Sequence, residues 1–378
     1  MGSMMSAGVN GVFVAGVSEI LGKRTNISAI DLNLKAGLAA LDDAGIQGKD
    51  VDGIFTGRPM GSHGAFSSSV GERIGADYFN VAHTIDVGGA SPTVMVHHAA
   101  EAVRSGTCRA VLVIYADNRL TKMSNRSVER LSKETHSVFE TPLGPTIASM
   151  YALLARRYLF EHRLEDTAFA RIAVNAAKNA SITPGALRGA PVSVEDVMAS
   201  RMISSPLRLL DCCLISDFAG ALVVTSQDLA HETRANKVRI LGSGEGHTHD
   251  HLVSARDPLV TGARLSSRRA FDQAKLSPDD IRSAQIYDCF TAAVAIEVEE
   301  VGLAEHGTGA EFAGRPTIPL NTNGGMLAFQ NGGIYHLTEA VTQLRGEAGD
   351  RQIPDRGPAL VHGTGGILSH HGTVILGA

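Results

Sequence analysis

The chain has 378 residues, of which 44% are hydrophobic and 41 are glycines. That length allows two domains or one large duplicated domain, and the composition is typical of an α/β protein with many tight turns. The formal net charge of −5 provides no basic footprint for nucleic acid. No run of about 18 apolar residues is present, so a membrane span is not expected.

The four cysteines show no CxxC spacing, and two of them are adjacent: Cys108, Cys212, Cys213 and Cys289. A disulfide framework or a zinc site is therefore not expected. Since no signal peptide follows the first residues, we predict a cytoplasmic protein. The histidine-rich run 247–251 is interpreted as a solvated loop, so no metal site is predicted.

Strands and helices alternate in the predicted secondary structure. Residues 12–17 predict a strand, and residues 29–44 have the apolar spacing of an amphipathic helix. An acidic turn and a strand at 53–56 follow. Residues 238–242 open a second half, and an apolar strand at 372–376 ends near the C-terminus.

A glycine turn is the most distinctive local pattern of the first half. The β-type run 81–87 breaks at Gly88 and Gly89, and small and apolar residues at helical spacing follow Pro92. This pattern predicts a strand, a tight turn and a buried helix. The unpaired N–H groups of that helix would point at whatever lies over the turn, and they could hold an oxyanion.

Two short sequence patterns of the first half recur in the second half in the same order. Residues 40–46 match 270–276, and Glu-Ala-Val at 101–103 returns at 339–341. Two ordered matches indicate a duplicated α/β unit. Residues 120–208 differ in character, with charge clusters and prolines such as Pro142, Pro145, Pro184 and Pro191, and we interpret them as an inserted loop domain. The predicted division is 6–119 with 209–237 for the N-terminal half, 120–208 for the insert and 238–378 for the C-terminal half.

Five motifs in this order resemble those of the thiolase superfamily, on its sterol-carrier-protein-x side: the Gly89 turn, Ser216-Asp217, Tyr287-Asp288-Cys289-Phe290, Asn321-Thr322-Asn323-Gly324-Gly325 and Val361-His362-Gly363-Thr364-Gly365-Gly366. The resemblance covers essentially the whole chain. It implies an α/β thiolase fold of two related βαβαβ halves, each with a mixed five-stranded sheet. The layers would be αβαβα, with the inserted loop domain added to them.

The residues that thiolysis requires are replaced. The position of the family's nucleophilic Cys falls on Gly89, and no Cys precedes Cys108. The family His falls on Gln330 or Asn331, and the second Cys position falls on His362 or Gly363. Without these groups an acyl-enzyme cannot form by the thiolase route, so we predict that the protein is not a functional thiolase.

The Tyr-Asp-Cys-Phe motif resembles that of thiolase-like aldolases of steroid side-chain degradation. The resemblance implies a retro-aldol cleavage of a β-hydroxyacyl-CoA, in which the thioester itself accepts the electrons, so no cofactor is needed beyond the coenzyme A of the substrate. A phenol can transfer the proton if its neighbours lower its pKa from about 10. The predicted catalytic residues are Tyr287 and Tyr335, with His336 and His362 as further candidates. The predicted oxyanion and substrate-binding residues are Gly89, Ala90, Ser91, Asn323, Gly324, Gly325 and Gly365.

Two other functions stay open at this point: a non-catalytic acyl-CoA or lipid-binding subunit, and an acyltransferase that works without a Cys. We expect a homodimer that pairs through an apolar edge strand at 110–115. The resemblance also implies a small acyl-CoA-binding partner with a zinc ribbon and an OB-fold. The insert offers a candidate surface for the phosphates of CoA at Arg119, Lys122, Arg126, Arg130 and Lys133.

Overall fold

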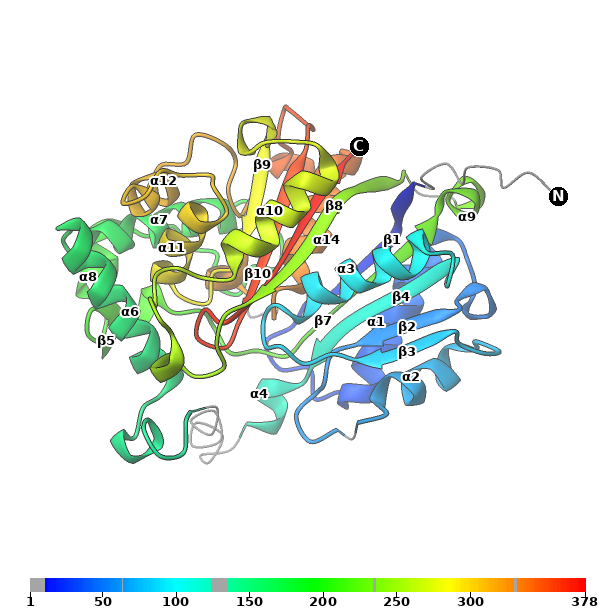
Figure 1. Ribbon diagram of the computed structural model, residues 1–378, viewed down its shortest axis with the longest axis horizontal. Coiled ribbons are helices and arrows are strands. Elements are labelled where there is room, and N and C mark those ends of the chain that lie inside the picture. Colours follow the sequence, from blue (N-terminus) through cyan, green and yellow to red (C-terminus); the bar gives the residue numbers. More distant parts are fainter. Residues whose placement is uncertain (1–10, 63, 124–134, 234–235, 330–331) are drawn as a thin grey trace.

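A computed structural model describes residues 11–62, 64–123, 135–233, 236–329 and 332–378 (Figure 1). Nine strands form one mixed sheet in the order β3-β2-β4-β7-β1-β8-β11-β10-β9. The sheet divides into two related halves where β1 meets β8, a short antiparallel pairing of Phe13 with Arg239 and Val14 with Val238. None of the helices in these ranges is long and apolar enough to cross a membrane.

The first half carries five strands, and its elements are β1 (Val12–Ile20), α1 (Ala29–Ala44), β2 (Gly53–Thr56), α2 (Phe66–Ile74), β3 (Val81–Thr84), α3 (Ser91–Arg104), β4 (Ala110–Asp117), β7 (Phe218–Ser226) and α9 (Gln227–Glu232). The second half carries four, and its elements are β8 (Val238–His247), α10 (Ala263–Ala274), β9 (Ser283–Ile286), α11 (Thr291–Glu300), α12 (Gly309–Gly314), α13 (Gly325–Ala328), α14 (Ile334–Arg345), β10 (Ala359–Gly365) and β11 (His370–Gly377). The predicted fifth strand of the second half is reduced to one isolated bridge, between Ala284 and Leu320.

The predicted duplication is visible in the packing of each half. Gly16 on β1 lies so close to α1 that an added Cβ would stand 2.2 Å from the Ala40 carbonyl oxygen. Gly242 on β8 repeats the contact, since its Cβ would stand 2.1 Å from the Ala270 carbonyl oxygen of α10. Each half therefore needs a glycine at the same place, where an outer helix rests directly on strand backbone.

Two helices form the layer between the halves. The helix α3 contacts β4 and β7 of the first half and β8, β10 and β11 of the second. The helix α14 contacts β1 and β7 on one side and β9 and β10 on the other. Because α14 faces sheet on two sides, it is buried at eleven of its positions, which include polar residues such as His336, Glu339 and Arg345.

The insert comprises α4 (Arg119–Lys122), α6 (Ile147–His162), α7 (Thr167–Ala180), α8 (Val194–Ala199), β5 (Met202–Ser204) and β6 (Leu207–Arg208). Its helices α6 and α7 gather beside α11 and α12 (Figure 1). Met150, Tyr151 and Leu154 of α6 share one apolar cluster with Ile286 and Leu360 of the second half. The insert is thus an extension of the C-terminal core.

The predicted edge strand is central in the structure. Residues 110–115 belong to β4, which is paired with β2 on one side and β7 on the other. All eight residues of β4 are buried, because an apolar strand of this kind gains most between two neighbours. The open edge of the first half is instead β3, which is only partly buried.

Arg345 ties α14 to the first half. Its guanidinium donates to Asp43 Oδ2 at 2.8 Å, to the Ala15 carbonyl at 3.0 Å and to the Asn236 carbonyl at 2.8 Å, and the side chain is 1% exposed. We expect Arg345→Met to lower the free energy of unfolding by roughly 1.5–3 kcal/mol, since charged donors to buried acceptors are lost. Urea unfolding measures this.

The matched control is Arg268→Met, because Arg268 is exposed on α10. It should change the free energy of unfolding by no more than about 0.5 kcal/mol. Equal effects of the two substitutions would contradict the bridging role of Arg345.

Candidate active site

The glycine turn before α3 is held together by its own serine. Gly88 has a φ of +61°, which favours glycine. Ser91 Oγ donates to the Gly88 carbonyl at 2.7 Å and accepts from the Val87 N–H at 2.9 Å. Ser91 is therefore committed to the turn, and Ala90 beside it is buried as the first residue before the helix.

The ring of Tyr287 occupies the space where a side chain at position 89 would be. An added Cβ on Gly89 would stand 2.1 Å from Tyr287 Cζ and 2.2 Å from its hydroxyl oxygen. Gly89 is not among the positive-φ glycines, so the ring and not the backbone excludes a side chain there. Two motifs almost 200 residues apart in the chain thus form one unit.

The C-terminal motif closes on the same turn. An added Cβ on Gly365 would stand 1.8 Å from the Val87 carbonyl oxygen, and one on Gly363 would stand 2.6 Å from Thr93 Oγ1. Gly333, with φ +91°, borders the Tyr287 ring, since its Cβ would lie 3.1 Å from two ring carbons. Gly89 and Gly333 therefore border the phenol, while Gly363 and Gly365 pack against the turn that carries Gly89.

Asp288 anchors the short helix α13. Its carboxylate accepts from the Met326 N–H at 2.7 Å and from the Leu327 N–H at 3.2 Å. Gly325, with φ +62°, permits this approach, because its Cβ would lie 2.2 Å from Asp288 Oδ2. Asn323 Oδ1 accepts from the Gly325 N–H at 2.9 Å.

These contacts show what the last three residues of the Asn321-Thr322-Asn323-Gly324-Gly325 motif do in the structure. Asn323, Gly324 and Gly325 shape the turn that presents α13 to Asp288, and Gly324 packs against Ala180 of α7, since its Cβ would lie 2.7 Å from that of Ala180. The sequence assigned the three residues to substrate binding, whereas in the structure the contacts they make support Asp288.

His336 completes a buried pair with Asp288. Its Nε2 lies 3.0 Å from Asp288 Oδ1, and both side chains are almost fully buried, at 2% and 1% exposure. A carboxylate only accepts, so Nε2 carries the proton and Nδ1 has the lone pair. Among the described residues Nδ1 has no hydrogen-bond partner. The His336 and Tyr287 ring centroids lie 6.2 Å apart.

The electrostatic surroundings of Tyr287 differ from the prediction. Burial raises the pKa of its phenol well above 10, Cys289 and Cys213 raise it further, and Arg119 only partly offsets them. The condition under which this phenol could act as a base, a lowered pKa, is therefore not met. The phenol stays protonated at neutral pH, so it is suited to donate a proton or a hydrogen bond and not to act as a base.

Tyr335 lies in the core. Its hydroxyl donates to the Ile20 carbonyl at 2.6 Å, and its ring contacts Phe329 edge-on. Burial raises the pKa of this phenol as well. The predicted catalytic role does not fit this placement, because the hydroxyl already has a partner on β1 and the ring is 1% exposed.

His362 lies on the opposite face of β10 from the glycine turn. Gly363 faces Thr93 of α3, and adjacent residues of a strand point to opposite faces. The His362 Nδ1 contacts Thr373 Oγ1 at 2.9 Å, which in turn contacts Ser266 of α10 at 2.8 Å. Its imidazole is thus separated from Tyr287 by the sheet, which contradicts the predicted acid/base role.

Sequence reasoning passed over Tyr115, and it considered Arg119 only as a candidate for binding the phosphates of CoA and not as a neighbour of the glycine turn. The Tyr115 hydroxyl donates to the Gly88 carbonyl at 3.3 Å, and Arg119 follows β4 with its guanidinium 5.6 Å from the Phe218 ring centroid and 3.2 Å from Asp117 Oδ2. The only signal available was that both lie at the end of β4, beside the turn. Gln330 and Asn331, the two candidates for the position of the family His, lie outside the described residues.

No thiol of the chain is poised as a nucleophile. Burial raises the pKa of Cys108, Cys212 and Cys213 to about 12 each, and it raises the pKa of Cys289 well above its usual value. Almost no thiolate forms at neutral pH, so capture of an acyl group by cysteine is disfavoured.

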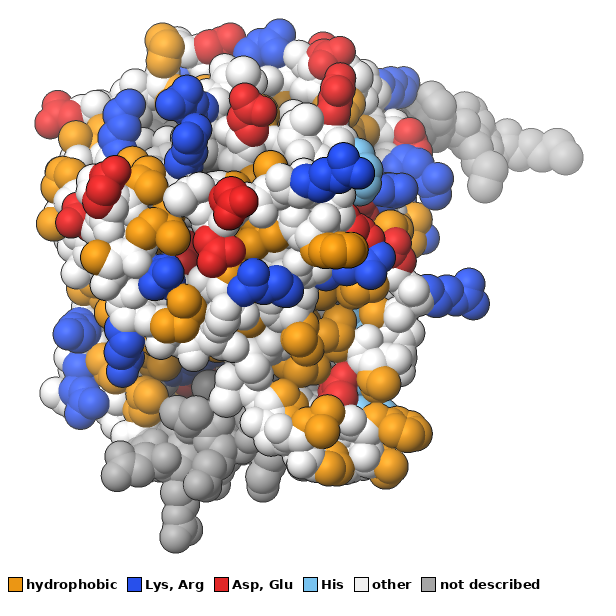
Figure 2. All heavy atoms as spheres, turned by 90° about the vertical axis from the view of Figure 1, so that its left-hand side faces the viewer, with side chains coloured by type: hydrophobic (Ala, Val, Ile, Leu, Met, Phe, Trp, Pro, Cys, Tyr) orange, Lys and Arg blue, Asp and Glu red, His pale blue; other side chains and the backbone are white. Residues whose placement is uncertain are grey.

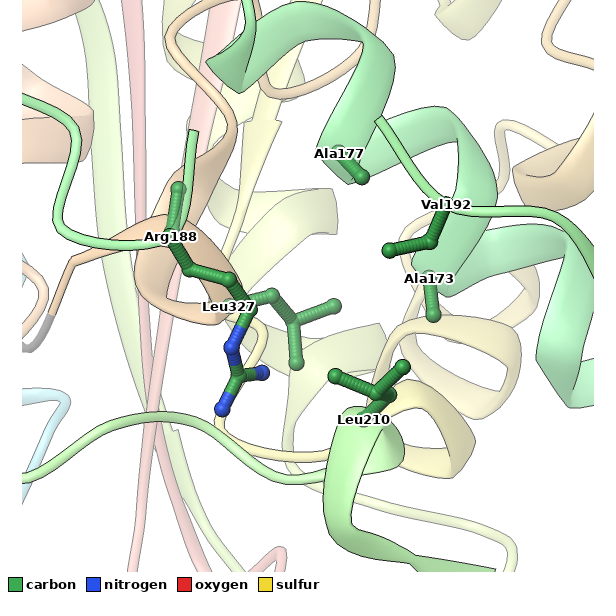
Figure 3. A pocket seen from close by; sticks show the side chains of 7 residues that line it. Ala173, Ala177, Arg188, Val192, Leu210 and Leu327 are labelled. Atoms are coloured by element: carbon green, nitrogen blue, oxygen red, sulfur yellow. The ribbon is translucent and has the colours of Figure 1, made fainter. Parts of the chain in front are cut away.

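Two hollows lie near α13 and residues 320–322, which precede it. The one in Figure 3 is lined by Arg188, Leu210, Leu327 and small residues of α7, and its volume of about 10 Å³ suits a water molecule at most. An open groove of about 590 Å³ lies between α7 and residues 314–322. Lys178 and Arg315 line it, so it is large enough and basic enough for part of a ligand.

Comparison with known proteins finds a matching family, similar sequences and a similar solved structure. Residues 244–378 match the family described as thiolase C-terminal domain-like. The chain is 32% identical to an acetyl-CoA acetyltransferase of Methanothermobacter thermautotrophicus, over 95% of this chain and 98% of that protein. It is 34% identical to a 17-hydroxy-3-oxo-4-pregnene-20-carboxyl-CoA lyase of Mycobacterium tuberculosis, over 86% and 88%. The solved Ltp2-ChsH2(DUF35) aldolase superposes with a TM-score of 0.87 at 29% identity, over 97% of this chain and 98% of that one.

The contact between Gly89 and Tyr287 can be tested by a double-mutant cycle. We expect Gly89→Ala to lower the free energy of unfolding by about 1–3 kcal/mol, because the Cβ overpacks against the ring. In a Tyr287→Ala background the same substitution should cost close to nothing, so the two effects are not additive. Urea unfolding of the four proteins gives the coupling.

Gly64→Ala is the control, since an added Cβ at Gly64 meets no atom within 4 Å. It should cost the same in both backgrounds. A Gly89→Ala cost that does not depend on Tyr287 would show that the ring is not what excludes a side chain.

Proposed function

The chain belongs to the thiolase superfamily, and we propose that within it this protein is an acyl-CoA carbon–carbon lyase, a retro-aldolase acting on a β-hydroxyacyl-CoA with a bulky, steroid-like acyl group. The observation that carries the proposal is the pairing of a protonated phenol with a buried Asp–His dyad beside the Gly89 turn. The names of the lyase and aldolase relatives support the same reaction class.

The reaction needs one base and one hydrogen-bond donor. His336 Nδ1 takes the proton of the β-hydroxyl, and Asp288 stabilises the imidazolium through Nε2–H. The Cα–Cβ bond breaks, its electron pair moves to Cα and the thioester carbonyl, and Cβ becomes the carbonyl of the released ketone or aldehyde. Tyr287 donates a hydrogen bond to the enolate oxygen. The imidazolium then returns the proton to Cα, which gives the shortened acyl-CoA.

Thiolysis is disfavoured by the same geometry. A Cys at position 89 would need the space that Tyr287 fills, and the pKa of every thiol in the chain is raised. The similarity to an acetyl-CoA acetyltransferase keeps acyl transfer without covalent capture as the second candidate function. A non-catalytic binding subunit is the third.

The reaction is tested with a panel of β-hydroxyacyl-CoAs, including ones with a steroid side chain. Mass spectrometry should detect a shortened acyl-CoA together with the released ketone or aldehyde. An acetylated product with no shortened CoA supports the acyltransferase instead, and bound but unchanged substrate supports the binder.

Tyr287→Phe should lower kcat by roughly 10²–10⁴, as loss of an acid/base group does, and His336→Gln should do the same. The stability cost of losing one hydroxyl should be about 1 kcal/mol. Because burial raises the phenol pKa, the rate should show no increase as pH approaches 10, and ionisation of Tyr287 should lower activity only above that pH.

Tyr335→Phe is the matched control. It removes the same hydroxyl from another buried tyrosine, so stability should fall similarly while kcat stays within a few-fold of wild type. Full activity in Tyr287→Phe, or an equal loss in Tyr335→Phe, would refute the assignment of roles.

We also propose that the chain acts as a homodimer with a small acyl-CoA-binding partner that has a zinc ribbon and an OB-fold, in a cytoplasmic compartment that keeps its four thiols free. The similar Ltp2-ChsH2(DUF35) aldolase carries the names of two proteins, which supports a partner of this kind. The open edge at β3 offers a strand for pairing with a second copy.

The charge distribution favours a partner. The candidate phosphate-binding residues Arg119 and Lys122 are engaged with Asp117 and the Met60 carbonyl, and the other three lie outside the described residues. On the face that carries the insert, Lys and Arg side chains are spread among acidic and hydrophobic ones (Figure 2). Three cationic side chains line the groove, Lys178, Arg315 and Arg351, and Arg351 is already paired with Glu339 at 2.9 Å.

The partner surface that we propose is an apolar segment before α6. Val138, Phe139 and Leu143 are 65%, 64% and 83% exposed, unusual for side chains of this kind. Leu143→Asp should weaken the complex by roughly tenfold or more, about 1.4 kcal/mol. Titration calorimetry measures this, and light scattering after size exclusion reports the dimer in the same samples.

Leu38→Asp is the control, because Leu38 is an exposed leucine on α1 in the other half, 49% exposed. It should leave partner binding unchanged. Full turnover by the purified chain with no gain from the partner would refute the partner proposal while leaving the lyase assignment intact.

A further inference from the structure

Three potential metal ligands meet in the core of the second half. They are Glu297 on α11, His362 on β10 and His371 on β11, and one ligand atom of each lies within 4.8 Å of the others. All three residues are 0% exposed. The two histidines lie on the face of the sheet turned away from the Gly89 turn, while Glu297 lies near enough to Asp288 for that carboxylate to raise its pKa.

The carboxyl group of Glu297 lacks hydrogen bonds. Both of its oxygens are buried without a partner among the described residues. Thr364 is close enough to affect the pKa of this carboxyl, but its Oγ1 is directed at His371 Nδ1, 3.3 Å away, and at the His370 carbonyl, 3.4 Å away. A buried carboxyl with neither oxygen satisfied is costly, which points to a missing ion or water.

Both histidines are oriented by their outer nitrogens. His371 Nε2 contacts the Leu368 carbonyl at 3.0 Å, and His362 Nδ1 contacts Thr373 Oγ1 at 2.9 Å. Their inner nitrogens, His362 Nε2 and His371 Nδ1, face each other at 3.2 Å. Metal-ligating histidines have this arrangement, with the second nitrogen anchored on a carbonyl or another polar group.

The spacing of the donor atoms suits a tetrahedral ion. Zinc–nitrogen bonds of about 2.0–2.1 Å place adjacent ligands of a tetrahedron about 3.3 Å apart. The two inner nitrogens are 3.2 Å apart, and Thr364 Oγ1 lies 3.3 Å from His371 Nδ1. We propose that Glu297, His362 and His371 form a structural binding site for a divalent transition-metal ion, zinc by its ligand chemistry.

The ligands come from rigid elements, so the ion would fasten α11 to β10 and β11. The sequence led us to expect no metal, because the three ligands are widely spaced in the chain and no local motif joins them.

A second cluster, His162, Glu299 and His306, is less suited to hold a metal ion. Glu299 Oε1 there already accepts from Tyr158 and the Gly309 N–H, and His306 is largely exposed.

The test is the metal content of the whole chain, expressed and purified with zinc and measured by inductively coupled plasma mass spectrometry. We expect about one zinc per chain. Glu297→Gln and His371→Gln should each lose nearly all of it, while His306→Gln, in the second cluster, should keep it. Cobalt in place of zinc should give the visible absorption of a tetrahedral site, and this signal should be absent from Glu297→Gln.

Circular dichroism identifies any variant that fails to fold, and the shape-conserving Glu297→Gln decides the outcome if His371→Gln does not fold. Wild-type protein without metal after growth and refolding in zinc would overturn the proposal. So would equal metal in Glu297→Gln and wild type, or loss of the metal in His306→Gln.

Discussion

The contact between the Tyr287 ring and Gly89 is the constraint on which the site depends. A side chain at position 89 and a tyrosine at position 287 would compete for the same volume, so a larger residue at position 89 requires the ring at position 287 to move or be replaced. Where a thiolase holds its nucleophile over the helix N-terminus, this chain holds a phenol. The fold of the family is retained while the proposed chemistry differs, because the Tyr287 ring from the second half fills the space that a side chain at position 89 of the first half would need.

The duplicated framework makes such an exchange possible. The helices α3 and α14 lie between the two halves and are packed on both sides, so the backbone around the turn is positioned by the core and not by the catalytic groups. Gly16 and Gly242 show how close this packing is, since each admits an outer helix onto strand backbone. A scaffold of this kind tolerates a new set of reacting residues as long as their volumes match.

The charges of the site follow from burial. With little water around it, the phenol of Tyr287 stays protonated, and the nearby thiols do as well. Asp288 beside Tyr287 accepts from two backbone N–H groups as well as from the His336 imidazole. The result is one donor and one acceptor near each other, which suits cleavage through an enolate and does not suit covalent catalysis.

The sequence by itself determined the α/β class, the duplication, the glycine turn and the absence of a cysteine there, because local residue patterns and internal sequence repeats encode these features. It also identified Tyr287 and His336 as candidates. Only the tertiary structure decided the roles. Alternation along β10 turned His362 to the far face, and the Ile20 carbonyl took up the hydroxyl of Tyr335. Burial raised the pKa of Tyr287, and the neighbours β2 and β7 placed β4 inside the sheet. Each of these depends on what lies across the fold from a residue, and a one-dimensional pattern contains no such information.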